Sequence, residues 1–147
     1  MIILDTNVLS EPLRREPSPS VVAWLDAQAI ETLYLTTICL AEIRCGIAAL
    51  PAGRRRSTLA RRFDREVLPR FRDRVLAFDE PAASAYGMLR AKARADGRAI
   101  GDFDALVAAI ADWRKFTVAT RDVSPFEAAG ITVINPFDLE PHAHNPT

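Results

Sequence analysis

Short runs of apolar residues alternate along the chain with longer segments in which apolar residues recur every three or four positions. The short runs are typical of buried strands, and the longer segments are typical of helices packed on one face. We expect strands over residues 2–4, 33–36, 75–78, 116–120 and 132–134. We expect helices over residues 7–14, 20–28, 37–50, 54–68, 80–95 and 102–113. This alternation predicts an α/β fold with a mainly parallel sheet covered by helices.

Acidic side chains stand at the ends of two of the predicted strands. Asp5 directly follows the opening apolar run, and Asp122 comes two residues after the strand that ends at residue 120. Functional groups of parallel α/β sheets collect outside the carboxyl ends of the strands, so we expect both acids at the same edge. A surface turn would account for either acid alone, but the pair favours a site.

The predicted helix over residues 37–50 carries a third acid, Glu42. An apolar stripe runs along this helix, and mostly small apolar residues cover the side that holds Glu42, so we expect the helix to be buried nearly all round. The stripe contains Leu40, Ile43, Ile47 and Leu50, and the other side contains Ile38, Ala41, Cys45, Ala48 and Ala49. Two interpretations of Glu42 stay open, a structural ion pair and a functional carboxylate.

A fourth acid, Asp104, stands near the start of the predicted helix in GDFDALVAAIADW. Asp102 is the candidate N-cap of that helix. Asp104 falls in the first turn, where free backbone N–H groups favour a negative charge. Ala108 and Ala111 follow one and two turns later and leave space beside its carboxylate. Because one cap is sufficient, Asp104 is available for another role.

Several carboxylates at one edge of a sheet require compensating charge. Two carboxylates about 4 Å apart repel by roughly 4 kcal/mol at an effective dielectric constant of about 20. Mg²⁺ and Mn²⁺ prefer such hard oxygen ligands, and their dominant use in carboxylate sites is phosphoester chemistry. The two histidines, His142 and His144, fall in the C-terminal tail. The predicted folded region therefore has no histidine for a zinc site or for a histidine-based mechanism. The candidate ligands of a Mg²⁺ or Mn²⁺ site are Asp5, Glu42, Asp104 and Asp122.

The composition is that of one globular domain. The chain has 147 residues and a formal net charge of zero, so the molecule as a whole does not attract polyanions. We expect residues 1–140 to form the domain and residues 141–147 to form a disordered tail. Cys39 and Cys45 are six helical positions apart, so we expect them to be unpaired and both buried, in a reducing compartment. The sequence shows no membrane-spanning run and no signal-peptide pattern, which predicts a cytoplasmic protein.

Positive charge is concentrated in one segment despite the neutral total. Residues 54–74 contain nine arginines against Asp64, Glu66 and Asp73. Arginine suits phosphate recognition, so this segment is a candidate contact for RNA or a partner protein. A solvated helix face with intrahelical ion pairs is the alternative. The residues named for such a contact are Arg54, Arg55 and Arg56.

Five motifs occur along the chain in a characteristic order: ILDTNVL, AEIRCGI around Glu42, DALVAAIA at Asp104, TVATRD ending at Asp122, and VINPF. Together they resemble the PIN-domain proteins, specifically the VapC/FitB-type toxins of bacterial type II toxin–antitoxin modules. The resemblance covers essentially the whole chain. It implies a three-layer α/β/α domain with a mainly parallel sheet of about five strands and an acidic pocket that binds Mg²⁺ or Mn²⁺.

The resemblance also implies an activity and a set of residue roles. It implies a ribonuclease that hydrolyses RNA phosphodiester bonds with a metal-activated water held by the four acids. The position of Asp122 is Asn in many relatives, so Asp122 is expected to be the least essential of the four. The motif register selects Asp104 and leaves Asp102 as an auxiliary acid. Side chains that support the pocket by hydrogen bonding are expected to be Thr6, Asn7 and Thr120.

Partners follow from the same resemblance. It implies a homodimer and a small DNA-binding antitoxin that blocks the acidic pocket, so operator DNA would be bound only through the antitoxin. One alternative is a PIN-fold module with weak catalysis that acts mainly by binding antitoxin or nucleic acid. A receiver-type signalling domain is disfavoured, because that site needs a lysine at a later strand end, and Lys92 and Lys115 stand elsewhere.

Overall fold

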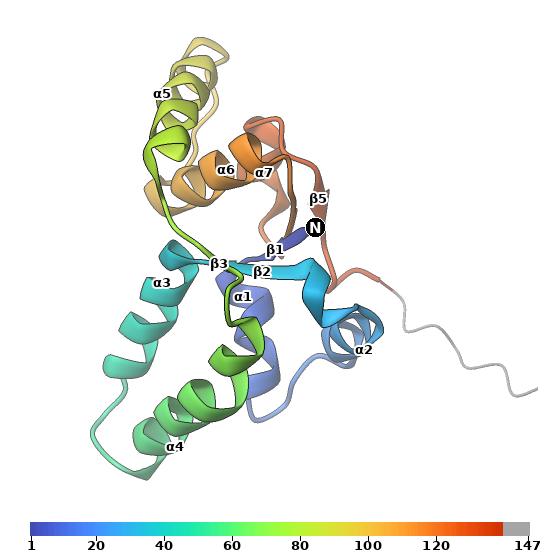
Figure 1. Cartoon of the computed structure of the whole chain (residues 1–147), viewed down its shortest axis with the longest axis vertical. Helices are drawn as coiled ribbons and strands as arrows, with labels where there is room; N and C mark the ends of the chain where they lie inside the picture. Colours follow the sequence, from blue (N-terminus) through green and yellow to red (C-terminus); the bar gives the residue numbers. More distant parts are fainter. Residues whose placement is uncertain (140–147) are drawn as a thin grey trace, which may run out of the picture.

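Five short parallel strands form one sheet through the middle of the structure (Figure 1). This computed structural model describes residues 1–139, so the predicted tail over residues 141–147, with His142 and His144, lies outside the described residues. The strand order is β3-β2-β1-β4-β5, which puts the first strand at the centre. The strands are β1 (Ile2–Leu4), β2 (Leu33–Thr36), β3 (Val75–Leu76), β4 (Thr117–Ala119) and β5 (Val133–Ile134).

Helices cover both faces of the sheet. In Figure 1, α1 to α4 lie on one side of the strands and α5 to α7 lie on the other. These helices are α1 (Thr6–Leu9), α2 (Pro19–Ala27), α3 (Thr37–Ala48), α4 (Arg54–Arg62), α5 (Glu80–Ala95), α6 (Asp102–Arg114) and α7 (Val123–Ala128). Short 3₁₀ segments span Glu11–Leu13, Ile30–Thr32 and Leu68–Phe71, and a π-helical turn spans Phe63–Val67. The result is the expected three-layer α/β/α arrangement.

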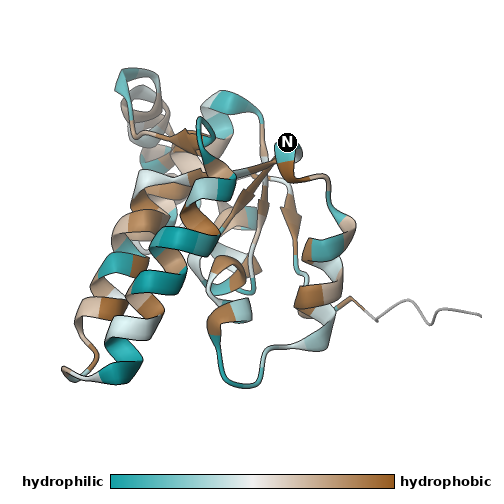
Figure 2. Ribbon diagram, turned by 60° about the horizontal axis from the view of Figure 1, so that its bottom comes forward, coloured by the Kyte–Doolittle hydropathy of each residue, from teal (hydrophilic) through white to brown (hydrophobic). Residues whose placement is uncertain are grey.

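Alternating side chains of the central strands supply two separate hydrophobic cores. Ile3 packs with α5, α6 and α7 on one face, while the next residue, Leu4, packs with the opposite helices. Val118 and Ala119 of β4 divide between the same two cores. Figure 2 shows the strands as largely hydrophobic ribbons and the helices as bands of apolar and polar residues. A parallel sheet covered on both faces requires this pattern.

The chain adds strands first on one side of β1 and then on the other. From β1 the chain moves outward to β2 and β3 with helices on one face, and it then returns to β4 and β5 with helices on the other. Since each such connection is expected to be right-handed, this reversal of direction places the two helical layers on opposite faces. The carboxyl ends of β1 and β4 therefore flank the topological switch point, where open α/β sheets form their binding crevice.

The predicted strands and helices form in the predicted order, with differences at their ends and one additional helix. All five strands form, and α5 has the predicted bounds. The predicted helix over residues 54–68 instead ends at Arg62, because the backbone passes into the π-helical turn and then a 3₁₀ turn with Pro69 near its start. The short helix α7 was not predicted. It has six residues, and Phe126 is its only buried residue.

Helix α3 differs from the prediction in its burial. Its fully buried residues are Cys39 and Ile43, whereas Ala41, Cys45 and Ala48 are exposed. The expectation of a helix buried nearly all round was therefore wrong, as was the expectation that both cysteines are buried. The physical reason is that α3 extends away from the sheet, so only one side of it meets the neighbouring layers (Figure 1). Both cysteines are unpaired, as expected.

Among residues 1–139, no helix combines the length and the apolar character that a membrane crossing requires.

Phe126 provides a test of how α7 is held. Its ring is fully buried in the core on the α5–α7 side, so Phe126→Ala should lower the free energy of unfolding by about 3–5 kcal/mol. Phe103→Ala is the matched control, because that ring is 57% exposed and its loss should change stability little. Denaturant unfolding measures both. Equal effects of the two substitutions would contradict the packing described here.

Candidate functional site

Asp5 stands at the switch point with its carboxylate buried between β1 and β4. Its backbone N–H donates to the carbonyl of Ala119 at 2.9 Å, which continues the β1–β4 pairing by one residue. The carboxylate is 5% exposed and accepts hydrogen bonds from the backbone N–H of Thr6 at 2.9 Å and from Oγ1 of Thr120 at 2.8 Å. The bond from Thr6 also caps α1. These contacts fix the orientation of the Asp5 carboxylate.

The Thr120 hydroxyl organises the surrounding loop. Besides donating to Asp5, its Oγ1 accepts from the backbone N–H of Asp122 at 3.1 Å and from Nδ2 of Asn7 at 3.3 Å. The Asn7 side chain in turn accepts from the backbone N–H of Arg121 at 3.1 Å. The structure thus places Thr120 and Asn7 between two of the candidate acids, tying the end of β4 to the start of α1.

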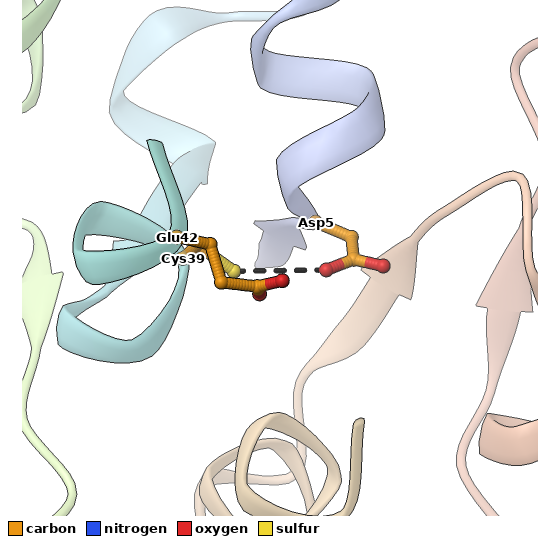
Figure 3. A group of neighbouring side chains, drawn as sticks. All are labelled: Asp5, Cys39 and Glu42. Atoms are coloured by element: carbon orange, nitrogen blue, oxygen red, sulfur yellow. Dashed lines mark hydrogen bonds between the residues drawn. The ribbon is translucent and has the colours of Figure 1, made fainter. Parts of the chain in front are cut away.

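Glu42 reaches the same place from α3. Its Oε1 accepts a hydrogen bond from Oγ1 of Thr6 at 3.1 Å. Cys39 lies one turn earlier on the same helix, and its Sγ donates to Oδ1 of Asp5 over 3.7 Å (Figure 3). One ligand atom from each of Asp5, Cys39 and Glu42 lies within 4.8 Å of the other two. Two of the predicted acids are therefore in direct proximity.

Asp104 and Asp122 add negative charge that the other acids of the cluster sense. The negative charges of Asp5 and Asp122 both raise the pKa of Asp104. The charge of Asp122 raises the pKa of Asp5, and the charge of Asp104 raises the pKa of Glu42. Asp104 sits in the first turn of α6, and Asp122 is exposed at the start of α7. Negative charge from neighbouring acids thus raises the pKa of Asp5, Glu42 and Asp104, although Asp104 and Asp122 lie outside the closest group.

Burial and like charge make this cluster hold protons more tightly than isolated carboxyl groups do. Burial is the largest cause of the raised pKa of Asp5, Glu42 and Asp104, and neighbouring carboxylates add to it. Burial and the charge of Asp5 also raise the pKa of the Cys39 thiol to about 12. Cys39 is therefore a protonated thiol that donates to Asp5.

The donor set fits a hard divalent cation. The carboxylate oxygens of Asp5 and Glu42 are the ligand type that Mg²⁺ and Mn²⁺ prefer, and the uncompensated charge is what such a cation would neutralise. A protonated thiol is a poor ligand for these metals, so Cys39 is suited to orienting Asp5. Sequence reasoning treated Cys39 only as a buried apolar residue. Its spacing places it on the helix face of Glu42, three positions earlier, but that spacing does not reveal the contact with Asp5.

Asp102 is placed differently from Asp104. The helix α6 begins at Asp102 itself with Gly101 as its N-cap, so the prediction of Asp102 as the cap was wrong. The Asp102 carboxylate is 91% exposed and pairs with the guanidinium of Arg90. The backbone of Gly101 is extended and leads directly into the helix. The Asp102 side chain therefore does not act as the cap and pairs with Arg90 of α5 instead.

The three candidate arginines begin α4, and one of them borders the acidic site. Arg55 lines an open hollow of about 250 Å³ together with Thr6 and Glu42. Arg56 donates to the carbonyl of Leu50 at 3.5 Å, and Arg54 is exposed. Within the Arg-rich segment, Arg62 pairs with Glu66 as the alternative interpretation expects.

Comparison with known proteins identifies the family. The family model described as PIN domain matches residues 2–131. The plasmid stability protein StbB of Pseudomonas syringae pv. tomato is 56% identical over 138 residues, covering 94% of this chain and 99% of that protein. The VapC ribonuclease Y4jK of Sinorhizobium fredii is 53% identical with the same coverage.

Solved structures agree. The crystal structure of FitAcB from Neisseria gonorrhoeae has a TM-score of 0.92 at 46% identity and covers 95% of this chain and all of that one. The structure of FitAB bound to IR36 DNA fragment also has a TM-score of 0.92 at 46% identity, covering 97% of this chain and all of that one. The chain belongs to the PIN-domain family, in its VapC/FitB-type group of toxins.

The raised carboxyl pKa values predict a specific pH dependence of stability. A carboxyl group with a higher pKa in the folded chain binds more protons when folded, so the free energy of unfolding falls as the pH rises above about 4. Glu42→Gln removes one such group and keeps an oxygen that accepts from Thr6. In EDTA, its melting temperature should exceed that of the wild type near pH 7, and the difference should shrink toward pH 4.

Thermal unfolding between pH 4 and 8 measures this effect. Glu31→Gln serves as the control, because Glu31 is exposed and precedes β2, whereas the acidic cluster lies at the carboxyl ends of the strands. Its melting curve should follow that of the wild type at every pH. A Glu42→Gln curve that also runs parallel to the wild type would show that the charge repulsion is absent.

Proposed function

We propose that this protein is the metal-dependent endoribonuclease toxin of a type II toxin–antitoxin module. The observation that carries the proposal is the pair of carboxylates, Asp5 and Glu42, held close together at the switch point within the electrostatic reach of Asp104 and Asp122. The name of the Sinorhizobium relative, a VapC ribonuclease, supports the same activity. A further relative, the toxin FitB of Neisseria gonorrhoeae, is 46% identical over 137 residues, and its name supports the role as a toxin.

The four acids and the side chains that hold them have separate proposed roles. Asp5, Glu42, Asp104 and Asp122 would hold Mg²⁺ or Mn²⁺, with Asp122 contributing least because it is exposed and oriented mainly through its backbone. When bound, such a metal supplies an activated water and neutralises charge on the scissile phosphate. Thr6 holds both Asp5 and Glu42 in place, through its backbone N–H and its hydroxyl respectively. Thr120, Asn7 and Cys39 restrict the movement of Asp5.

Partners form a second part of the proposal. Two similar solved structures are described as FitAcB and as FitAB bound to a DNA fragment. We therefore propose a small DNA-binding antitoxin as the partner of this chain, with operator DNA contacted only through that antitoxin, and a homodimer of the toxin. Arg54, Arg55 and Arg56 are the proposed contact residues for RNA or antitoxin, and the supporting observation is that Arg55 borders the same hollow as Glu42.

Asp104→Asn tests the catalytic role of the cluster. The substitution removes one charge and one candidate metal ligand without changing the size of the side chain. We expect cleavage of an end-labelled RNA in the presence of Mg²⁺ or Mn²⁺ to fall by more than about 100-fold, since even residues that only support metal ligands cost about 10–100-fold. EDTA should abolish cleavage by the wild type.

The matched control is Asp112→Asn, which lies on the same helix at its opposite end and faces Lys115. It should cleave RNA at the wild-type rate. Cleavage that persists in EDTA, or full activity of Asp104→Asn, would refute the metal-dependent mechanism. Binding of RNA or antitoxin without any cleavage by the wild type would instead identify a PIN-fold binding module.

A further inference from the structure

A hollow lined by arginines lies between α5 and the beginning of α6. Its volume is about 600 Å³, and its lining includes Arg90, Arg94 and Arg98. The acidic residue in its lining is Asp102, which the guanidinium of Arg90 already pairs. The hollow therefore has a net positive lining, in a protein whose formal net charge is zero.

Arg90 is held rigidly as part of the scaffold. Its Nε donates to the hydroxyl of Tyr86 at 3.1 Å, and its Nη1 donates to the carbonyl of Ile100 at 2.6 Å. Its guanidinium also stacks over the Tyr86 ring at 5.2 Å. These contacts, with the ion pair to Asp102, use Arg90 to join α5 to the start of α6.

Arg94 and Arg98 are presented differently, with exposed side chains. Neither forms a salt bridge with any residue of the described part of the chain. Their backbones are nevertheless fixed, because Gly97 adopts a left-handed φ of 67° and ends α5. The backbone N–H of Gly97 donates to the backbone carbonyl of Arg94 at 3.1 Å, and the backbone N–H of Arg98 donates to the backbone carbonyl of Ala93 at 2.8 Å. Two cationic side chains thus project from a rigid turn.

A second hollow extends from this turn toward α7. It measures about 350 Å³ and shares Arg98 and Ala99 with the first, while Ser124 lines its other side. Its acidic lining residue is Glu127. The two hollows therefore reach Asp102 and Ser124, which stand two residues from Asp104 and Asp122 respectively. Arg98 lines both hollows, so it lies where the surface between α5 and α6 continues toward α7.

We propose that Arg94 and Arg98 bind phosphates of a single-stranded RNA segment on its way to the acidic cluster. This inference rests on the proposed function, because it takes RNA as the substrate. Exposed arginines without protein partners suit phosphate oxygens, which accept from the planar guanidinium in pairs. Phe103 follows Asp102 directly, and its ring is 57% exposed. Exposed aromatic rings are typical of single-strand binding, because bases stack on them.

The test measures binding, so it does not depend on cleavage. The probe is a fluorescein-labelled 12-nucleotide RNA of mixed sequence without secondary structure, titrated with the full chain in EDTA at several salt concentrations. For the double variant Arg94→Gln and Arg98→Gln, we expect the dissociation constant to rise roughly tenfold. The magnitude of the slope of the logarithm of the association constant against the logarithm of the salt concentration should fall by about 1.4, because each phosphate contact to a single strand contributes about 0.7.

The control is the double variant Arg15→Gln and Lys115→Gln, which removes the same number of positive charges at exposed positions away from the hollows. It should bind the probe with a wild-type salt slope. An unchanged slope in the Arg94 and Arg98 variant, with its melting temperature also unchanged, would overturn the inference, as would equal losses in both double variants. Loss of antitoxin binding with RNA binding intact would also overturn it and would identify a protein-docking surface.

The outcome is separable from the proposed function. A wild-type chain that binds the probe through Arg94 and Arg98 but does not cleave RNA with Mg²⁺ or Mn²⁺ would support the binding path and refute the ribonuclease activity. Metal-dependent cleavage by the wild type, together with an unchanged salt slope in the Arg94 and Arg98 variant, would support the ribonuclease activity and refute the binding path.

Discussion

A buried carboxylate directly after the central strand is the constraint on which the structure depends. Burying Asp5 is costly unless its oxygens are hydrogen bonded, and the bonds come from α1, β4 and α3 together. This requirement fixes the β1–β4 register at its end, because Thr120 reaches Asp5 only when the strands pair as they do. It also draws the first turn of α3 against the sheet, where Cys39 completes the set. The same contacts that satisfy Asp5 bring Glu42 beside it.

The acidic cluster therefore stores unfavourable energy in a rigid frame. Burial and mutual repulsion both oppose the ionised forms of Asp5, Glu42 and Asp104. The two hydrophobic cores hold the elements that carry these residues, so the side chains cannot move apart to relieve the repulsion. A cation would be favoured by the relief of this repulsion as well as by its own coordination. Strain of this kind at a functional site is expected to lower stability locally in exchange for a prepared site.

Much of the fold follows from sequence patterns because the strands are short, mostly apolar runs between longer segments with helical spacing. The positions of Asp5 and Asp122 follow from the same runs, since a strand end is visible in the sequence. The short helix α7 was missed because one buried residue, Phe126, gives no periodicity. The exposure of α3 was mispredicted because apolar composition does not reveal where a helix leaves the sheet. The bond from Cys39 to Asp5 depends on a contact across 34 positions, which spacing alone does not specify.

The distribution of the acidic cluster along the chain has a consequence for synthesis. Asp5 directly follows the first strand, but its partner Thr120 comes 115 positions later, and the acid Asp122 follows Thr120. The central strand also lacks its β4 neighbour until residues 117–119 are made, so its edge on that side is unpaired until then. A nascent chain therefore emerges from the ribosome without a complete pocket. The acidic cluster is therefore complete only after nearly all of the elements from β1 to β4 have been synthesised.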